Sequence, residues 1–111
     1  MLGIEYNDTF TLGRGVVITK QSIVVGSSTS NLGDADGILG LGPVELSLGT
    51  MPNEPTMTIP TVTQNLWFQN IISEAIVGIS FEPISSASIV YGELAFGRVD
   101  SSKYTGDLAF V

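Results

Sequence analysis

The side chains of this sequence that could do chemistry are carboxylates. The 111 residues include eleven aspartates and glutamates, four lysines and arginines, and neither histidine nor cysteine. A chain of this composition cannot form a disulfide, a thiolate nucleophile, a Cys/His zinc site or a Ser-His-Asp triad. Acid–base work by paired carboxylates is the chemistry that remains open.

Asp34 and Asp36 are a candidate pair, because residues two positions apart share one face of a strand. Catalysis by such a pair needs surroundings that push the two pKa values apart, and the Gly/Ser/Asn-rich turn here supplies none. The same residues resemble the first residues of a calcium-binding loop. However, Ile38 and Leu39 stand where that loop needs an oxygen ligand and a glycine. We therefore predict no metal site and no cofactor, and interpret both aspartates as structural or solvated.

Glycines at positions 37, 40 and 42 suggest a phosphate-binding loop, but their order is G-x-x-G-x-G and no Lys-Ser/Thr follows. Residues 36–41 instead read as a nearly continuous apolar run. This run predicts a buried strand whose glycines allow close approach of neighbouring backbone.

The formal net charge is −7 and the sequence pI is about 4.1. Nucleic acid and anionic membrane surfaces would repel such a chain, so neither is an expected partner. No apolar run approaches the roughly 18 residues of a membrane-spanning helix, and the first residues do not resemble a signal peptide. Asn7-Asp8-Thr9 fits the N-glycosylation sequon, which makes Asn7 a candidate glycosylation site and favours a secreted parent protein.

Short β-rich runs, punctuated by glycine, proline and Ser/Thr clusters, make up most of the chain. Pro60 and the apolar spacing after it predict a helix over residues 61–71, and residues 44–48 fit one helical turn. The sequence therefore predicts a mainly β domain, or part of one. The predicted strands are residues 10–12, 15–19, 22–25, 36–41, 75–81, 88–96 and 106–111.

Four motifs, in order along the chain, carry a resemblance to pepsin-like aspartic endopeptidases. Residues 35–42 resemble the family's D-G-I-L-G-L/I-G segment, and Asn65-Leu66-Trp67-Phe68-Gln69 resembles its N-L-W/Y-x-Q helix. Residues 92–106 resemble its G-E-L-x-F-G…D-S-S-K-Y-T-G stretch, and residues 5–13 resemble the strand that leaves the active-site flap. Residues 20–23 are most similar to the secreted, polyporopepsin-like enzymes of basidiomycete fungi.

The resemblance implies a fold and a mechanism. A family enzyme has two lobes, and each gives one aspartate from a D-T/S-G-T/S motif to a pair that shares a proton and activates water. This chain contains no D-T-G or D-S-G. We therefore expect residues 1–111 to form a partial N-terminal lobe, antiparallel β with one or two short helices, without a catalytic residue. The catalytic motifs are expected upstream and downstream, and peptides or proteins are the expected substrates of the longer parent.

Carried over residue by residue, Ile38 matches the aliphatic wall of the S1 and S3 substrate pockets. Ala35 departs from pepsin, where a phenylalanine lines the pocket, so the wall here would be more open. From the residues alone, Ile38 could equally be a plain core residue. The remaining motif positions are expected to be structural, and Asp36 is not a catalytic aspartate in this family; these positions are Asp36, Gly37, Leu39 and Gly40.

Two functions remain open at this point. The chain is either part of a secreted acid endopeptidase and inactive alone, or a standalone, non-catalytic β module that binds a partner with the same scaffold. The first hypothesis predicts unpaired strands and exposed apolar faces, and hence poor solubility or loose packing. The second predicts a folded monomer or dimer with a saturable partner.

Overall fold

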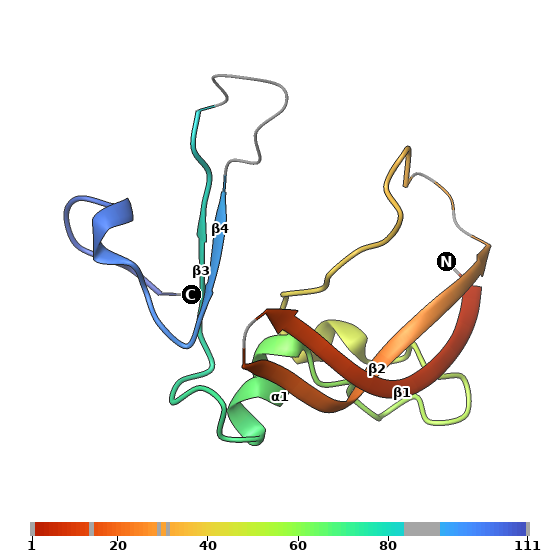
Figure 1. Ribbon diagram of the computed structural model, residues 1–111. Coiled ribbons are helices and arrows are strands. Elements are labelled where there is room, and N and C mark those ends of the chain that lie inside the picture. Colours follow the sequence, from red (N-terminus) through yellow and green to blue (C-terminus); the bar gives the residue numbers. More distant parts are fainter. Residues whose placement is uncertain (1, 14, 29, 31, 84–91, 111) are drawn as a thin grey trace.

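The computed structural model describes residues 2–13, 15–28, 30, 32–83 and 92–110, and is mainly antiparallel β with one short α-helix (Figure 1). This architecture confirms the predicted fold class. None of the helices in the described part of the chain is long and apolar enough to cross a membrane. The elements are β1 (Leu2–Gly13), β2 (Val16–Ser28), the 3-10 turn η1 (Val44–Ser47), α1 (Val62–Phe68), β3 (Val77–Ser80), β4 (Glu93–Phe96) and the 3-10 turn η2 (Ser101–Lys103).

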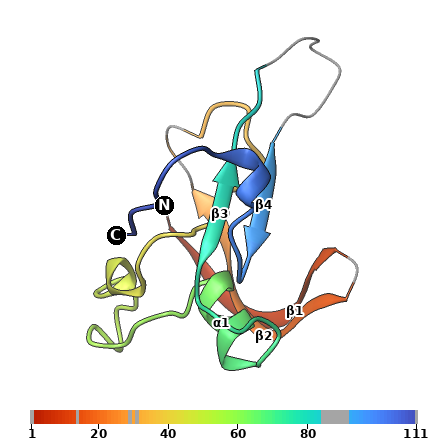
Figure 2. The same ribbon diagram turned by 90° about the vertical axis from the view of Figure 1, so that its left-hand side faces the viewer.

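The strands form two separate antiparallel hairpins, β1–β2 and β3–β4. Figures 1 and 2 show the β3–β4 hairpin projecting away from β1–β2, with α1 near the junction. The radius of gyration is 16.1 Å, whereas a compact domain of this length has a value of about 13 Å. The chain is therefore an open arrangement of two hairpin units.

A β-bulge divides the long β1–β2 hairpin into two halves. Phe10 pairs with Ile18 and Asp8 pairs with Gln21, so that two β2 residues lie opposite one β1 residue. Lys20, one of the two, has a left-handed backbone with φ of 56°. The sequence predicts separate strands at residues 15–19 and 22–25; the structure joins them into β2, and the predicted break is this bulge.

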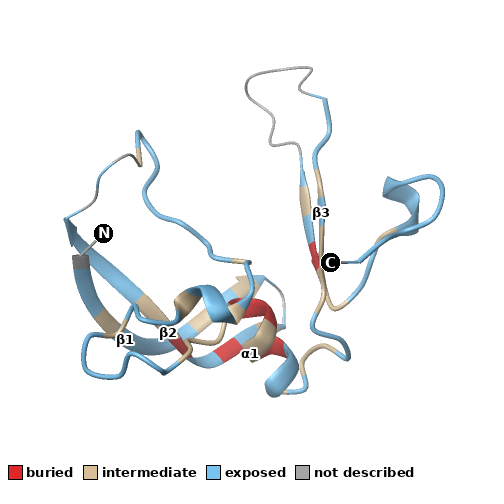
Figure 3. Ribbon diagram, turned by 180° about the vertical axis from the view of Figure 1, so that it is seen from behind, coloured by how far each residue is buried: buried red, intermediate tan, exposed pale blue. Residues whose placement is uncertain are grey.

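The core lies where α1 packs on β2. Val62 and Leu66, four residues apart, present one face of the helix to Ile18, and all three are buried. Figure 3 shows most of the buried residues gathered at this contact. Full burial of one such side chain stabilises the fold by about 1.5–3 kcal/mol. The partly buried side chains that complete the cluster are Phe10, Leu12, Val16, Ile71, Ile72 and Phe96.

The ends of α1 are fixed by capping. Thr61 is the N-cap and forms a capping box with Gln64, so Pro60 precedes the cap and does not open the helix itself. At the other end Asn70 takes φ of 57°, and the amides of Asn70 and Ile71 donate to the Trp67 and Leu66 carbonyls. This Schellman pattern ends the helix at Phe68, three residues before the predicted end.

Two predicted strands are wrong. Residues 36–41 are neither strand nor buried, and residues 106–110 form no strand. A strand needs a neighbour for its backbone groups, and neither segment pairs with a strand of the two hairpins. The predicted strand at 75–81 shortens to β3. Of the strand predicted at 88–96, β4 covers residues 93–96, while residues 88–91 lie outside the described residues.

Candidate functional site

The predicted substrate-pocket segment runs from the turn after β2 toward η1 as exposed, extended chain (Figure 1). Ile38 is 71% exposed and Leu39 is 41% exposed. The Ala35 amide donates to the Leu32 carbonyl at 3.2 Å, which closes the turn before the segment. Residues 36–42 make no hydrogen bond within the described part of the chain. The segment thus presents apolar side chains and unpaired backbone to the surface.

The glycines of this segment do not approach other backbone. A Cβ added to Gly37 or Gly40 would meet nothing within 4 Å, and one added to Gly42 would lie 3.2 Å from Leu46 Cδ1. The prediction of a buried strand with close backbone contact is therefore wrong in this structure. The run is apolar, but no element of the described chain covers it.

The candidate carboxylates are not assembled into a site. Asp34 and Asp36 are exposed, and neither side chain makes a hydrogen bond or ion pair within the described residues. The described residues also contain no cluster of three or more His, Cys, Asp or Glu side chains that could hold a metal ion. The chain's aspartates therefore present no paired, desolvated arrangement of the kind that acid–base catalysis requires.

The N-L-W-F-Q motif has a structural role that its sequence alone did not reveal. Gln69 Oε1 accepts from the Thr19 amide at 3.0 Å and from Thr19 Oγ1 at 3.2 Å, while Gln69 Nε2 donates to the Thr19 carbonyl at 2.9 Å. The carboxamide thus satisfies both backbone groups of a bulge residue. The available signal was the pair of amides four residues apart, Asn65 and Gln69, on the helix face that carries Leu66.

Asn65 makes the second polar contact between α1 and β2. Its Nδ2 donates to Gln21 Oε1 at 2.9 Å, and Gln21 Nε2 donates to the carbonyls of Ser22 at 3.1 Å and Pro60 at 3.4 Å. Gln21 is only 6% exposed, so these bonds satisfy an amide that would otherwise be costly to bury. Together with the Gln69 contacts, they fasten the helix to both sides of the bulge.

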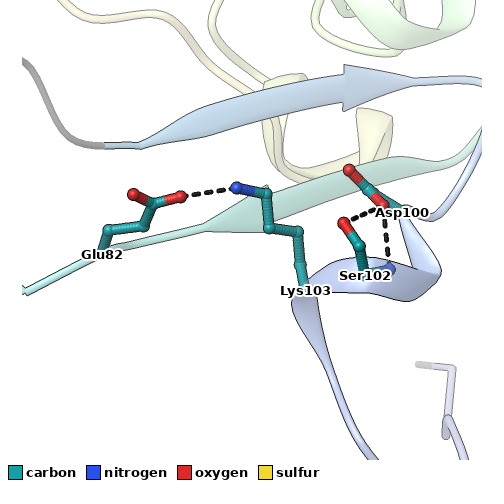
Figure 4. A network of polar contacts seen from close by, with 4 residues as sticks. All are labelled: Glu82, Asp100, Ser102 and Lys103. Atoms are coloured by element: carbon teal, nitrogen blue, oxygen red, sulfur yellow. Dashed lines mark hydrogen bonds and ion pairs between the residues drawn. The ribbon is translucent and has the colours of Figure 1, made fainter.

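The motif after β4 is also structural. Gly97 has φ of 73°, and a Cβ there would lie 2.5 Å from Ile72 Cβ, so only glycine fits. Asp100 Oδ1 accepts from the Ser102 amide at 2.9 Å and from Ser102 Oγ at 2.7 Å, and these bonds lower the pKa of Asp100 (Figure 4). The Glu82 carboxylate, 2.5 Å from Lys103 Nζ, raises the pKa of Lys103.

Two hollows lie elsewhere on the molecule. One, of about 320 Å³, opens between the β1–β2 hairpin and the chain before α1, and the predicted glycosylation residue Asn7 lines it. The other, of about 580 Å³, lies between the β3–β4 hairpin and residues 99–110. Neither is lined by residues 35–40, so the structure does not bring the predicted pocket residues together with either hollow.

Comparison with known proteins gives concordant matches over the whole chain. A family model described as eukaryotic aspartyl protease matches residues 1–111. Polyporopepsin of Irpex lacteus is 50% identical over 108 residues, which are 97% of this chain and 32% of that protein. Rhizopuspepsin-2 of Rhizopus niveus is 35% identical over 112 residues, covering 98% of this chain and 26% of that protein.

The fold agrees with these matches. The crystal structure of an aspartic proteinase from Irpex lacteus superposes with a TM-score of 0.88 and 51% identity, over 95% of this chain and 31% of that one. The chain therefore spans about a third or less of the length of these relatives. The resemblance to this family is confirmed, and the chain belongs to the eukaryotic aspartyl protease family.

Proposed function

We propose that this chain supplies the non-catalytic part of the N-terminal lobe of an acid endopeptidase, with residues 1–111 forming a partial lobe. The observation that carries the proposal is 50% identity to polyporopepsin over 97% of the chain. In the longer protein, two aspartates from D-T/S-G motifs would share a proton and activate the water that attacks the peptide carbonyl. Those motifs are not among the 111 residues.

The chain alone is inactive under this proposal. Peptide hydrolysis by carboxylates requires two groups close enough to share a proton. Asp36, the conspicuous aspartate of the D-G-I-L-G-L-G motif, is exposed and makes no hydrogen bond within the described residues. Its surroundings give it no partner for such a pair.

The substrate-contacting role falls to the segment after β2. Ile38 forms the aliphatic wall of a substrate pocket, and Ala35 leaves that wall more open than a phenylalanine would. Ile38 is 71% exposed in this chain, which leaves the side chain free to contact substrate or another part of the parent protein. Asp36, Gly37, Leu39 and Gly40 shape the backbone that carries these two side chains.

An activity assay separates this proposal from the alternative of a standalone binding module. The 111-residue chain and the longest in-frame protein that contains it are incubated with a denatured protein substrate at acid pH, with and without pepstatin. We expect cleavage by the longer protein alone, and inhibition by pepstatin. Cleavage by the short chain overturns its inactivity. An inactive longer protein, together with a cooperatively folded short chain that binds a partner saturably, supports the binding module.

Secretion and glycosylation at Asn7 belong to the same proposal. Asn7 is exposed on β1, opposite Ser22, and lines the smaller hollow, where a glycan has access from solvent. Expression in a secreting fungal host should give a glycosylated product whose mass falls after endoglycosidase treatment. The Asn7→Gln variant should carry no glycan at this site and should have the lower mass before any treatment. An unchanged mass for the unsubstituted protein after endoglycosidase treatment would reject the site.

A further inference from the structure

The bulge in the β1–β2 hairpin places one extra residue in β2, which has no residue of β1 to pair with. Thr19 and Lys20 together lie opposite Thr9, and neither takes part in the ladder that joins Phe10 to Ile18 and Asp8 to Gln21. A bulge bends the strand that contains it and increases the local twist. The conformation of the bulge therefore determines the direction in which the far half of the hairpin projects.

Gln69 supplies the missing backbone partner. Its carboxamide accepts from the Thr19 amide at 3.0 Å and donates to the Thr19 carbonyl at 2.9 Å. A neighbouring strand would offer the same donor and acceptor, so the side chain replaces a peptide group in the ladder. This pairing joins residues 50 positions apart in the sequence. Contacts of that separation fix tertiary geometry, and local strand propensity cannot replace them.

The helix that Gln69 caps is held against β2 by packing and hydrogen bonds. Leu66, three residues earlier, is completely buried against β2, and Asn65 donates to Gln21 on the other side of the bulge. The C-terminal Schellman bonds end the helix at Phe68 and leave Gln69 as its C-cap. The bulge is thus fixed between two amide contacts from one helix.

We infer that Gln69 is a positioning residue, whose carboxamide fixes the Thr19–Lys20 bulge and so sets the direction of the far half of the β1–β2 hairpin. The structural part of the inference stands on the 111-residue chain itself. Its consequence for catalysis rests on the proposed function: in the parent enzyme, β1 would carry the strand that leaves the active-site flap, and its direction would affect how well substrate is held.

Amide hydrogen exchange on the 111-residue chain tests the structural part. In Gln69→Leu, the Thr19 amide should exchange about tenfold faster, the change expected when a backbone donor loses its partner. The matched control is Gln64→Leu on the same helix, which removes half of the capping box but no hydrogen bond to the described residues of β2. Unchanged Thr19 protection in Gln69→Leu, or equal acceleration in both variants, overturns the inference.

A deletion keeps the test decisive if Gln69→Leu does not fold. Removing Lys20 makes the two strands equal in length across the bulge, and it leaves Ile18 and Gln21 on the face that meets α1. In the Lys20 deletion Thr19 pairs with β1, so adding Gln69→Leu should cost much less stability than it does with Lys20 present. Equal costs in the two backgrounds would overturn the inference.

Kinetics of the longer protein test the catalytic consequence. Gln69→Leu should raise KM and leave kcat unchanged, because holding the substrate is an interaction made equally in the ground and transition states. Equal losses in kcat and kcat/KM would reject this consequence. If the unsubstituted longer protein has no peptidase activity, the proposed function fails, while hydrogen exchange still decides the role of Gln69 in the hairpin.

Discussion

The two hairpins of this chain are held by different forces. The β1–β2 hairpin spans 12 and 13 residues, and α1 covers its near half with a buried apolar cluster and amide hydrogen bonds. The β3–β4 hairpin has strands of four residues and, among the described residues, only Ala95 is buried in it. Exposed polar contacts around η2 hold the segment that follows β4 (Figure 4). The comparison predicts that core substitutions act mainly on the first hairpin, and pH on the second.

The two units meet at a narrow junction. Ile72 follows α1 and packs against the core of the first unit, and Gly97 directly follows β4 and touches Ile72. The Gly97 amide donates to the Ile76 carbonyl at 2.9 Å, and Phe96 also packs against the core. Disruption at this junction should loosen the β3–β4 hairpin and leave the larger β1–β2 unit folded.

The largest effect is expected in the core of the first unit. Leu66→Ala removes a completely buried side chain that packs on Ile18, and should lower the free energy of unfolding by about 2–5 kcal/mol. Denaturant titration of the α1 and β2 signals measures the loss. The matched control is Leu46→Ala, at a side chain 76% exposed, which should change stability by less than about 0.5 kcal/mol. Similar losses in both variants would mean that the α1–β2 contact is not the main source of stability.

The second effect tests the junction. Gly97→Ala places a Cβ 2.5 Å from Ile72 Cβ in a left-handed conformation, which should cost about 1–3 kcal/mol. We expect faster hydrogen exchange in β3 and β4 and little change in β1 and β2. Gly40→Ala, where an added Cβ meets nothing within 4 Å, is the matched control. Uniform acceleration across both hairpins would show that the chain unfolds as one unit.

The helix and most strands could be predicted from the sequence, because they depend on local signals. Pro60 and the apolar spacing locate α1, and the Lys20-Gln21 interruption marks the bulge in β2. The error at residues 36–41 has a physical cause. Hydrophobicity indicates a segment that favours burial, but only tertiary structure determines whether a neighbouring strand is available to bury it.

In the candidate site, too, some features follow from the local sequence and others depend on tertiary contacts. The motif positions identify the family, yet the role of Gln69 depends on Thr19, 50 residues away, and no periodic pattern encodes that pairing. Whether Ile38 is exposed likewise depends on whether another element covers the segment after β2, and in the described chain none does. Sequence reasoning located the residues of interest, and the structure was needed to say what each one contacts.

A smaller effect is expected at the bulge. Lys20 has φ of 56°, a conformation that costs an L-residue about 1 kcal/mol and costs glycine almost nothing. Lys20→Gly should therefore stabilise the first hairpin by at most about 0.5 kcal/mol, because the larger unfolded-state entropy of glycine offsets half or more of the gain. Lys20→Ala, which keeps the Cβ, should give no such gain in denaturant titration. A destabilised Lys20→Gly variant would show that the lysine side chain itself stabilises the bulge.

The smallest effect concerns pH and the second hairpin. The Ser102 hydroxyl and amide both donate to Asp100, so the pKa of its carboxyl is lower in the folded chain than its ordinary value of 3.8. A depressed folded-state pKa contributes stability that is fully present above the unfolded value and is lost as the pH falls through the folded value. The η2 turn should therefore loosen only below about pH 4, seen as a lower protection factor of the Ser102 amide against its intrinsic exchange rate at each pH. Asp100→Asn keeps an acceptor for the turn but cannot titrate, so it should remove this pH dependence, whereas Asp36→Asn should leave it unchanged. Loosening of η2 at the same pH in Asp100→Asn would show that Asp100 is not the group responsible.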